Sequence, residues 1–259
     1  MITGPCLTFI IPAYLKTIDD RNVLLETIGK ILNIASDVVV ISQGLNPNLD
    51  HKNIRNYHSE SSLGKWNAVS KAKKFILNKF VFIHDGDNPF KAESYKNILK
   101  FERNSFIQRD TILLFAQDEL SRESRKYIEL FLNKYSVEEK GACVDIQSGA
   151  MILESDIFQK LNFSSFGDYG GELAIYDYLI KHDIPVDAID MAVEEGDSRQ
   201  RSHYTIEKIL RSVIRSPLSM TRVFEILEIC LHDCDRYIDF SQKFKTEILY
   251  FLEKYDLIY

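Results

Sequence analysis

Apolar residues in the first part of the chain follow two patterns. Short runs that are apolar at nearly every position predict strands buried on both faces, because successive side chains of a strand point to opposite faces; these runs cover residues 7–14, 37–44 and 80–84. Between them, apolar residues recur every three or four positions, which predicts helices over residues 19–35, with Asp19 or Asp20 as N-cap, and 63–77. This order indicates an α/β fold with a mostly parallel central sheet flanked by helices.

The same alternation of elements continues to about residue 193. We expect helices over residues 97–103, 119–135 and 170–184, strands over 111–117 and 185–193, and a mixture of short strands and a helix over 143–161. From residue 204 onward the pattern is helical to the end of the chain. The expected organisation is therefore one α/β domain over residues 1–203 and a helical C-terminal extension over residues 204–259.

Composition narrows the class of protein. The 259 residues are 45% hydrophobic and 27% charged, which is ordinary for a globular protein with a packed core. The net charge of -6 argues against a broad nucleic-acid-binding surface. There is no basic leader before the first apolar run, no apolar run long enough to span a bilayer, and the four cysteines are mostly scattered. These features predict a cytoplasmic protein that binds no nucleic acid.

The strand expected at residues 80–84 ends in two carboxylates, Asp85 and Asp87, with Gly86 between them. Ligands of parallel α/β sheets bind beyond the carboxyl ends of the strands. Two neighbouring carboxylates repel each other unless a cation is bound, and Mg²⁺ and Mn²⁺ prefer oxygen ligands together with substrate phosphates. The segment therefore predicts a divalent-metal site that holds a diphosphate, with a plain Asp-Gly turn as the alternative. His84 is expected to point away from this site, since side chains alternate along a strand.

Three segments resemble motifs of the GT-A nucleotide-sugar glycosyltransferases, especially the large bacterial polysaccharide family similar to glycosyltransferase family 2. They are LTFIIPAYLK at the first strand, LGKWNAVSKAKKF at the second helix and FIHDGDNPF at the carboxylate pair. The resemblance implies a GT-A fold over most of the chain before the helical extension. It also implies a hexosyltransferase that moves a sugar from a nucleotide-diphospho-sugar, by default a UDP-sugar, to a hydroxyl of a glycan, lipid-linked or protein acceptor, with Mn²⁺ or Mg²⁺ as cofactor.

The resemblance also implies roles for individual residues. The metal ligands would be Asp85, Asp87 and His203. The contacts to the nucleotide sugar would come from Pro12, Ala13, Tyr14, Gln43, Lys65, Asn67, Asp85, Ser148, Gly149, Arg199 and Arg201. Gln43 departs from the family, which usually has an acidic residue at this position, so its contact with the base stays open.

The segment FGDYGGELAIYDYLIKHDIPV is similar to the family's Gly-Glu-Asp motif at the start of a helix. Glu172 matches the glutamate of that motif, which implies a general base for the acceptor hydroxyl, with Asp168 as the second carboxylate. A carboxylate at a helix N-terminus also has a structural explanation in the helix dipole. Leu173 replaces the motif's aspartate. Because retaining GT-A enzymes need no such base, inverting and retaining transfer both stay open.

Two other functions stay open. A nucleotidyltransferase also uses a metal and an α/β sheet, although the Gly-rich signature usual after its first strand is missing here. A non-catalytic nucleotide-binding or scaffold domain with a degenerate site would account for the neutral Gln43 and for Leu173. The apolar stripes of the expected C-terminal helices are compatible with core packing, with a homo-oligomer contact, or with peripheral association with the inner face of a membrane.

Overall fold

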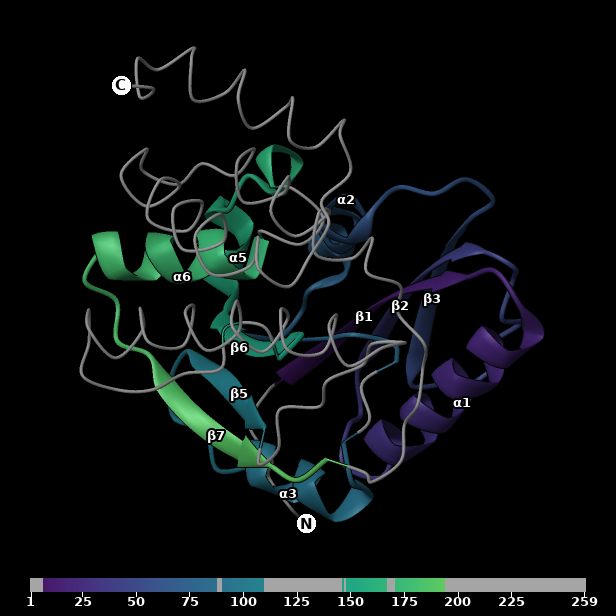
Figure 1. Ribbon diagram of the computed structural model, residues 1–259, viewed down its shortest axis with the longest axis horizontal. Helices are drawn as coiled ribbons and strands as arrows, with labels where there is room; N and C mark the ends of the chain where they lie inside the picture. The colour runs from purple at the N-terminus through teal and green to yellow at the C-terminus, as the bar shows by residue number, and fades with distance from the viewer. Residues whose placement is uncertain (1–6, 88–89, 110–145, 147, 167–170, 194–259) are drawn as a thin grey trace, which may run out of the picture.

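The fold is built on a seven-stranded sheet with helices on both faces (Figure 1). The computed structural model describes residues 7–87, 90–109, 146, 148–166 and 171–193. Across the sheet the strand order is β3-β2-β1-β4-β6-β5-β7. The strands are β1 (Leu7–Leu15), β2 (Val38–Gly44), β3 (Ile54–Ser59), β4 (Phe80–His84), β5 (Ser105–Arg109), β6 (Ala150–Glu154) and β7 (Asp187–Met191). Only β6 of these runs antiparallel to its neighbours, so the predicted α/β class with a mostly parallel sheet is confirmed.

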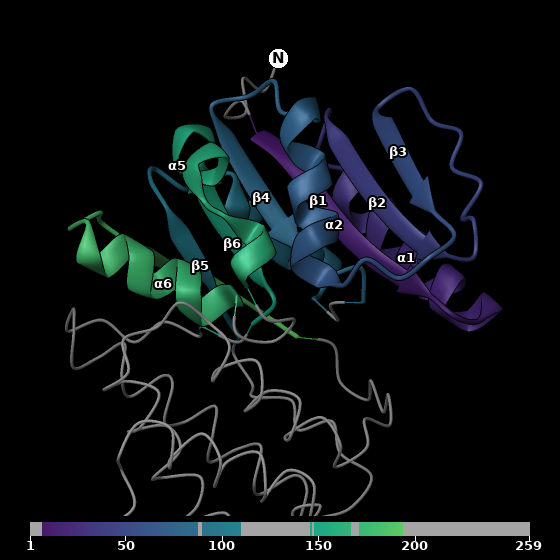
Figure 2. The ribbon, with the colours of Figure 1, turned by 90° about the horizontal axis from the view of Figure 1, so that it is seen from above.

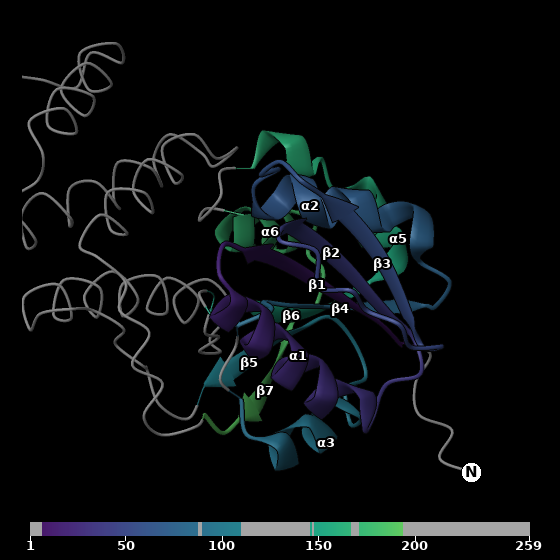
Figure 3. The same cartoon turned by 90° about the vertical axis from the view of Figure 1, so that its right-hand side faces the viewer.

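Helices form a layer on each face of the sheet. The described ones are α1 (Ile18–Leu32), α2 (Lys65–Lys71), α3 (Tyr95–Ile98), α5 (Ser155–Lys160) and α6 (Gly171–Lys181), with 3-10 turns η1 (Ala72–Phe75), η2 (Ala92–Ser94) and η3 (Phe163–Ser165). Figure 3 shows α2, α5 and α6 above one face and α1 and α3 below the other. In Figure 2 the layer of α2, α5 and α6 lies in front of the sheet. None of the described helices is long and apolar enough to cross a membrane.

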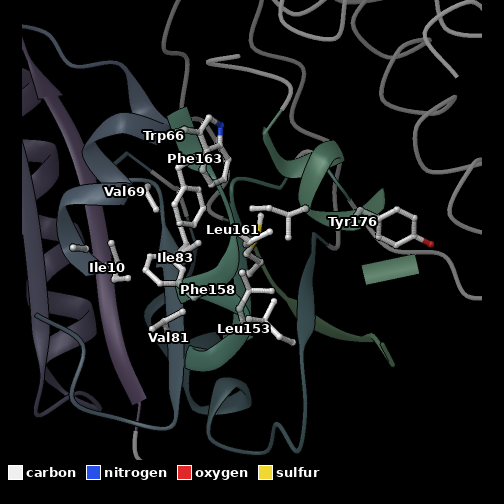
Figure 4. Packing of buried hydrophobic residues seen from close by; sticks show 14 of the residues in the cluster. Ile10, Trp66, Val69, Val81, Ile83, Leu153, Phe158, Leu161, Phe163 and Tyr176 are labelled. Atoms are coloured by element: carbon white, nitrogen blue, oxygen red, sulfur yellow. The ribbon is translucent and has the colours of Figure 1, made fainter. Parts of the chain in front are cut away.

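The sheet divides the apolar interior into two cores, one on each face. Consecutive residues of β1 serve both: Ile10 packs on the α2 side, while Phe9 and Ile11 pack on the α1 side. This is why the strand is apolar at nearly every position. Burial of each large apolar side chain contributes about 1.5–3 kcal/mol. Figure 4 shows the core on the α2 side, where side chains from the sheet, α2 and the α5–η3 segment interleave, among them Val81, Ile83, Trp66, Val69, Phe158 and Phe163.

The first helix is capped two residues before Asp19 and three before Asp20, the two predicted caps. Its N-cap is Thr17, whose hydroxyl oxygen accepts a hydrogen bond from the Asp20 backbone N–H at 3.2 Å. The Asp20 carboxylate accepts one from the Thr17 backbone N–H at 2.8 Å in return. The prediction of Asp19 or Asp20 as N-cap was therefore wrong, because Asp20 is the third residue of a capping box rather than the cap itself.

Other differences concern short elements. The helix expected over residues 97–103 ends at Ile98, since Phe101 leaves the helix and packs edge-on against Phe80, with ring centroids 4.8 Å apart. Strands β3 and β5 were not predicted. The residues of β3 are mostly half-exposed and mixed in polarity, so they show no strand pattern. The elements expected over residues 111–117, 119–135 and 204–259, and the expected domain boundary at residue 203, lie outside the described residues.

Candidate active site

The Asp85-Gly86-Asp87 turn follows β4 directly, at the edge where β1 and β2 also end. Both carboxylate residues are half-buried, while Gly86 is buried. A Cβ atom at Gly86 would lie 3.1 Å from the Ala13 Cβ and 3.2 Å from the Leu24 Cδ1, so a glycine allows the turn to pack against β1 and α1. The turn therefore presents two carboxylates at the position where α/β sheets bind ligands.

Lys65 connects the turn to two helices. It is the first residue of α2, and its Nζ lies 2.8 Å from the Asp85 Oδ1 and also contacts the Glu172 carboxylate of α6. Burial lowers the pKa of Lys65, but the carboxylates of Asp85 and Glu172 more than offset it and hold the pKa above its usual value. Lys65 is thus a charged ammonium, and a single positive charge is shared by two carboxylates.

Glu172 lies in the first turn of α6 and is only 4% exposed. Its Oε1 accepts from Lys65, whereas its Oε2 has no hydrogen-bond partner among the described residues. Burial raises the pKa of Glu172 and Lys65 opposes this rise. Buried carboxylate oxygens are normally hydrogen-bonded, so the unpaired Oε2 is suited to accept a hydrogen bond from a ligand hydroxyl.

The side chain of Trp66 explains how α2 and α6 come together. Trp66 is 1% exposed and stacks on Phe163, with ring centroids 5.9 Å apart and an interplanar angle of 5°. On α6, a Cβ at Gly171 would lie 2.0 Å from the Trp66 Cε2, so only a glycine fits against the indole ring. This contact places Glu172 beside Lys65. Trp66 is therefore a core-packing residue.

The residues expected to contact the base lie at the ends of β1 and β2. Tyr14 is 50% exposed and lies in register with Gln43, while Pro12 and Ala13 are buried. The Gln43 Oε1 accepts a hydrogen bond from the Leu63 backbone N–H at 2.5 Å. Tyr14 is therefore accessible at the end of β1, whereas Gln43 supports the loop before α2.

Asn67, Ser148 and Gly149 make mainly local contacts. The Asn67 side-chain amide donates to the Leu63 carbonyl at 3.1 Å, so it supports the same loop as Gln43. Ser148 is buried, and its hydroxyl donates to the Ala150 carbonyl at 3.0 Å. Gly149 has φ of 74°, a conformation that favours glycine, and its carbonyl accepts from the Asp85 N–H at 3.1 Å. Ser148 and Gly149 therefore shape the backbone next to the carboxylate turn.

His84 points away from the carboxylates, as the alternation along the strand predicted. It is fully buried among aromatic rings on the α3 side, and the Tyr95 hydroxyl lies 2.7 Å from its Nε2. Burial lowers the pKa of His84 to about 4. The imidazole is therefore neutral at physiological pH. The sequence alone did not indicate its pairing with Tyr95.

Several expected site residues cannot be placed in this geometry. Asp168, Arg199, Arg201 and His203 lie outside the described residues. Within the described part of the chain, no group of three or more His, Cys, Asp and Glu side chains could hold a metal. Asp85 and Asp87 nevertheless offer the oxygen ligands that Mg²⁺ and Mn²⁺ prefer, on one tight turn. These two residues fit part of a divalent-metal site.

Comparison with known proteins gives similarity at the level of structure. No protein-family model and no curated protein sequence matches the chain. Among solved structures, glucosyl-3-phosphoglycerate synthase from Mycobacterium tuberculosis in complex with UDP is similar, with a TM-score of 0.57 and 15% identity over 88% of this chain and 80% of that one. The same enzyme in complex with Mn²⁺, UDP and glucosyl-3-phosphoglycerate gives a TM-score of 0.59 and 16% identity over 83% and 82%. The chain therefore has the fold of these synthases, which confirms the expected GT-A architecture.

Proposed function

We propose that this protein is a metal-dependent glycosyltransferase that uses a nucleotide-diphospho-sugar, by default a UDP-sugar. The observation that carries the proposal is the Asp85-Gly86-Asp87 turn at the ligand-binding edge of a GT-A sheet, with Lys65 and Glu172 beside it. The two similar solved structures described above support this donor and metal, since both contain UDP and one also contains Mn²⁺. Another structure of the same enzyme holds UDP-glucose and phosphoglyceric acid together.

The carboxylates of Asp85 and Asp87 would hold Mn²⁺ or Mg²⁺, with His203 as the proposed third ligand. A divalent ion there would neutralise charge that builds up on the leaving nucleoside diphosphate. Together Asp85, Asp87, Glu172 and Lys65 carry a formal charge of -2 when all are ionised, so this part of the site favours a dication. Arg199 and Arg201 are the proposed contacts to the diphosphate.

Lys65 would change partners when the donor binds. Its ammonium contacts both Asp85 and Glu172. A diphosphate bound at the metal would compete for this ammonium, because phosphate oxygens are strong acceptors for charged donors. Donor binding would then loosen the hold of Lys65 on Glu172.

Glu172 is the proposed residue for the acceptor hydroxyl. Its Oε2 is the carboxylate oxygen left unpaired within the described residues, and its raised pKa brings it closer to the range of a general base. In an inverting reaction it would take the hydroxyl proton as the acceptor oxygen attacks the anomeric carbon. In a retaining reaction it would only orient the hydroxyl, and Asp168 is the second carboxylate available for either role. The acceptor is a hydroxyl compound such as a glycan, a lipid-linked sugar or a protein, or a small acid like the phosphoglyceric acid of the similar structures.

Hydrolysis of nucleotide sugars, measured as release of the nucleotide (a nucleoside diphosphate, or CMP from CMP-sugars), tests the proposal. We expect Mn²⁺-dependent release from one class of donor, abolished by EDTA and reduced at least about 100-fold by Asp87→Asn, because the substitution removes a metal ligand. Asp156→Asn is the matched control, since Asp156 is exposed in the first turn of α5, after the opposite end of the sheet. Absence of release from UDP-, GDP-, CMP- and dTDP-sugars would favour the non-catalytic domain instead.

A further inference from the structure

The backbone of Asp85 is held at both of its polar groups. Its N–H donates to the Gly149 carbonyl at 3.1 Å, and its carbonyl lies 2.7 Å from the Nδ1 of His84. A carbonyl oxygen can only accept, so the Nδ1 carries the proton and donates. The orientation of the Asp85 carboxylate therefore depends on a backbone held by Gly149, the residue before β6, on one side and by the His84 imidazole on the other.

The imidazole is itself fixed by its surroundings. With the proton on Nδ1, the Nε2 is an acceptor, and the Tyr95 hydroxyl donates to it at 2.7 Å. The Tyr95 ring stacks on the imidazole with centroids 5.6 Å apart, and Phe82 and Phe90 contact it with their edges. His84 and Tyr95 are both fully buried. A buried histidine with both nitrogens paired has one tautomer and one orientation.

We infer that His84 and Tyr95 are positioning residues for the carboxylate turn. Tyr95 fixes the orientation of the imidazole, and the imidazole fixes the orientation of the Asp85 carbonyl. The Asp85 carbonyl in turn determines the direction of the Asp85 and Asp87 side chains. The role of the turn as a metal site rests on the proposed function, but the hydrogen bonds that fix the turn do not. Residues behind metal ligands typically change metal affinity by about 10- to 100-fold when they are replaced.

A purely structural role for the pair is the competing explanation, because any buried hydrogen bond stabilises a fold. The two explanations differ in where the effect is felt. Loss of a purely structural contact lowers the global stability, and the turn then becomes no more mobile than the rest of that sheet edge. Loss of a positioning contact loosens the turn more than the rest of the protein and weakens the metal site beyond the loss of stability.

The test compares His84→Leu and Tyr95→Phe with Thr8→Val. Thr8 is also fully buried and donates a 2.6 Å hydrogen bond to Asp37, but it lies near the opposite end of β1. Two quantities are measured for each protein: amide hydrogen exchange of the segment 84–87 without metal, and the affinity for Mn²⁺ in the presence of UDP by titration calorimetry. Tyr95→Phe removes one hydroxyl and leaves the ring, so it keeps the test open if His84→Leu does not fold.

The inference predicts that Tyr95→Phe and His84→Leu accelerate exchange in the segment 84–87 at least about tenfold and weaken Mn²⁺ binding by about 10- to 100-fold, while Thr8→Val changes neither. Equal exchange and equal Mn²⁺ affinity in all three variants would overturn it. If the wild-type protein binds no Mn²⁺ with any nucleotide but exchange still accelerates in the two variants alone, the proposed function fails and the positioning of the turn stands.

Discussion

The ammonium of Lys65 contacts the carboxylate of Glu172, a residue 107 positions further along the chain. This contact joins the start of α2 to the start of α6 near the carboxyl ends of β1 and β4. The same ammonium lies 2.8 Å from Asp85, so one lysine connects both helices with the carboxylate turn. The single ammonium therefore offsets only part of the negative charge of the two carboxylates.

Removal of Lys65 is expected to destabilise the protein strongly. Lys65→Met leaves the buried Glu172 without its partner, and loss of one partner of a buried ion pair costs about 3–5 kcal/mol. Because Lys65 and Asp85 are partly exposed, we expect the lower end, about 3 kcal/mol in urea unfolding at pH 7.5.

The double variant Lys65→Met/Glu172→Gln separates charge from packing. It should regain at least half of the lost stability, since no buried carboxylate then lacks a counter-charge. Arg103→Met is the matched control: Arg103 and Asp187 form an ion pair in which both side chains are about half-exposed, so its loss should cost less than about 1 kcal/mol. An equal loss for Lys65→Met and Arg103→Met would mean that the buried pair stabilises the protein no more than an exposed one.

Gly171 is expected to tolerate no side chain. In Gly171→Ala the new Cβ would overlap the indole of Trp66, which is rigid and buried, and overpacking of this kind costs about 1–3 kcal/mol. Gly29→Ala serves as the opposite case, because Gly29 lies within α1 and a Cβ there meets nothing within 4 Å. It should stabilise the protein by about 0.5–1 kcal/mol. Urea unfolding of the two variants measures both effects, and a neutral Gly171→Ala would contradict the packing described for α2 and α6.

Stability should fall in mild acid because of His84. Its pKa is lowered to about 4 in the folded protein by burial, below the ordinary value of 6.5, so the unfolded chain binds the proton more readily. The stability that depends on a neutral His84 is fully present above pH 6.5 and is lost as the pH falls toward 4. The total loss is about 3 kcal/mol.

Urea unfolding of the metal-free protein between pH 7.5 and 4.5 measures this dependence. His84→Leu removes the titrating group and should flatten the slope between pH 6.5 and 4.5. His182→Leu is the control, because His182 follows α6 and is exposed, and its slope should match that of the wild type. A wild-type slope retained in His84→Leu would assign the acid sensitivity to other groups.

The sequence predicted what depends on local pattern. Strands such as β1 and β4 are apolar at consecutive positions because both faces are covered, and this pattern is visible without a structure. The carboxylates of Asp85 and Asp87 were placed by the same reasoning, since they follow such a strand. Strand β3 was not predicted, because its residues are mostly half-exposed and do not alternate between apolar and polar.

Contacts between distant segments could not be predicted in this way. Nothing in the local sequence shows that Lys65 forms an ion pair with Glu172. Nor does it show that position 171 needs a glycine because Trp66 occupies the space that a Cβ atom would fill. The sequence also did not show that Gln43 and Asn67 both hydrogen-bond to the backbone of Leu63. Such relationships arise from tertiary packing and became visible only in the fold.

The central claim is that the carboxylate turn binds a metal together with a nucleoside diphosphate. A thermal-shift titration with UDP, GDP, CMP and dTDP, each with and without Mn²⁺, tests it most directly, because a ligand that binds only the folded state raises Tm. We predict a Mn²⁺-dependent rise with one nucleotide, UDP by default, that is lost in Asp87→Asn and kept in Asp156→Asn. A wild-type Tm that no nucleotide raises in the presence of Mn²⁺ would contradict the account and leave Asp85-Gly86-Asp87 as a plain turn.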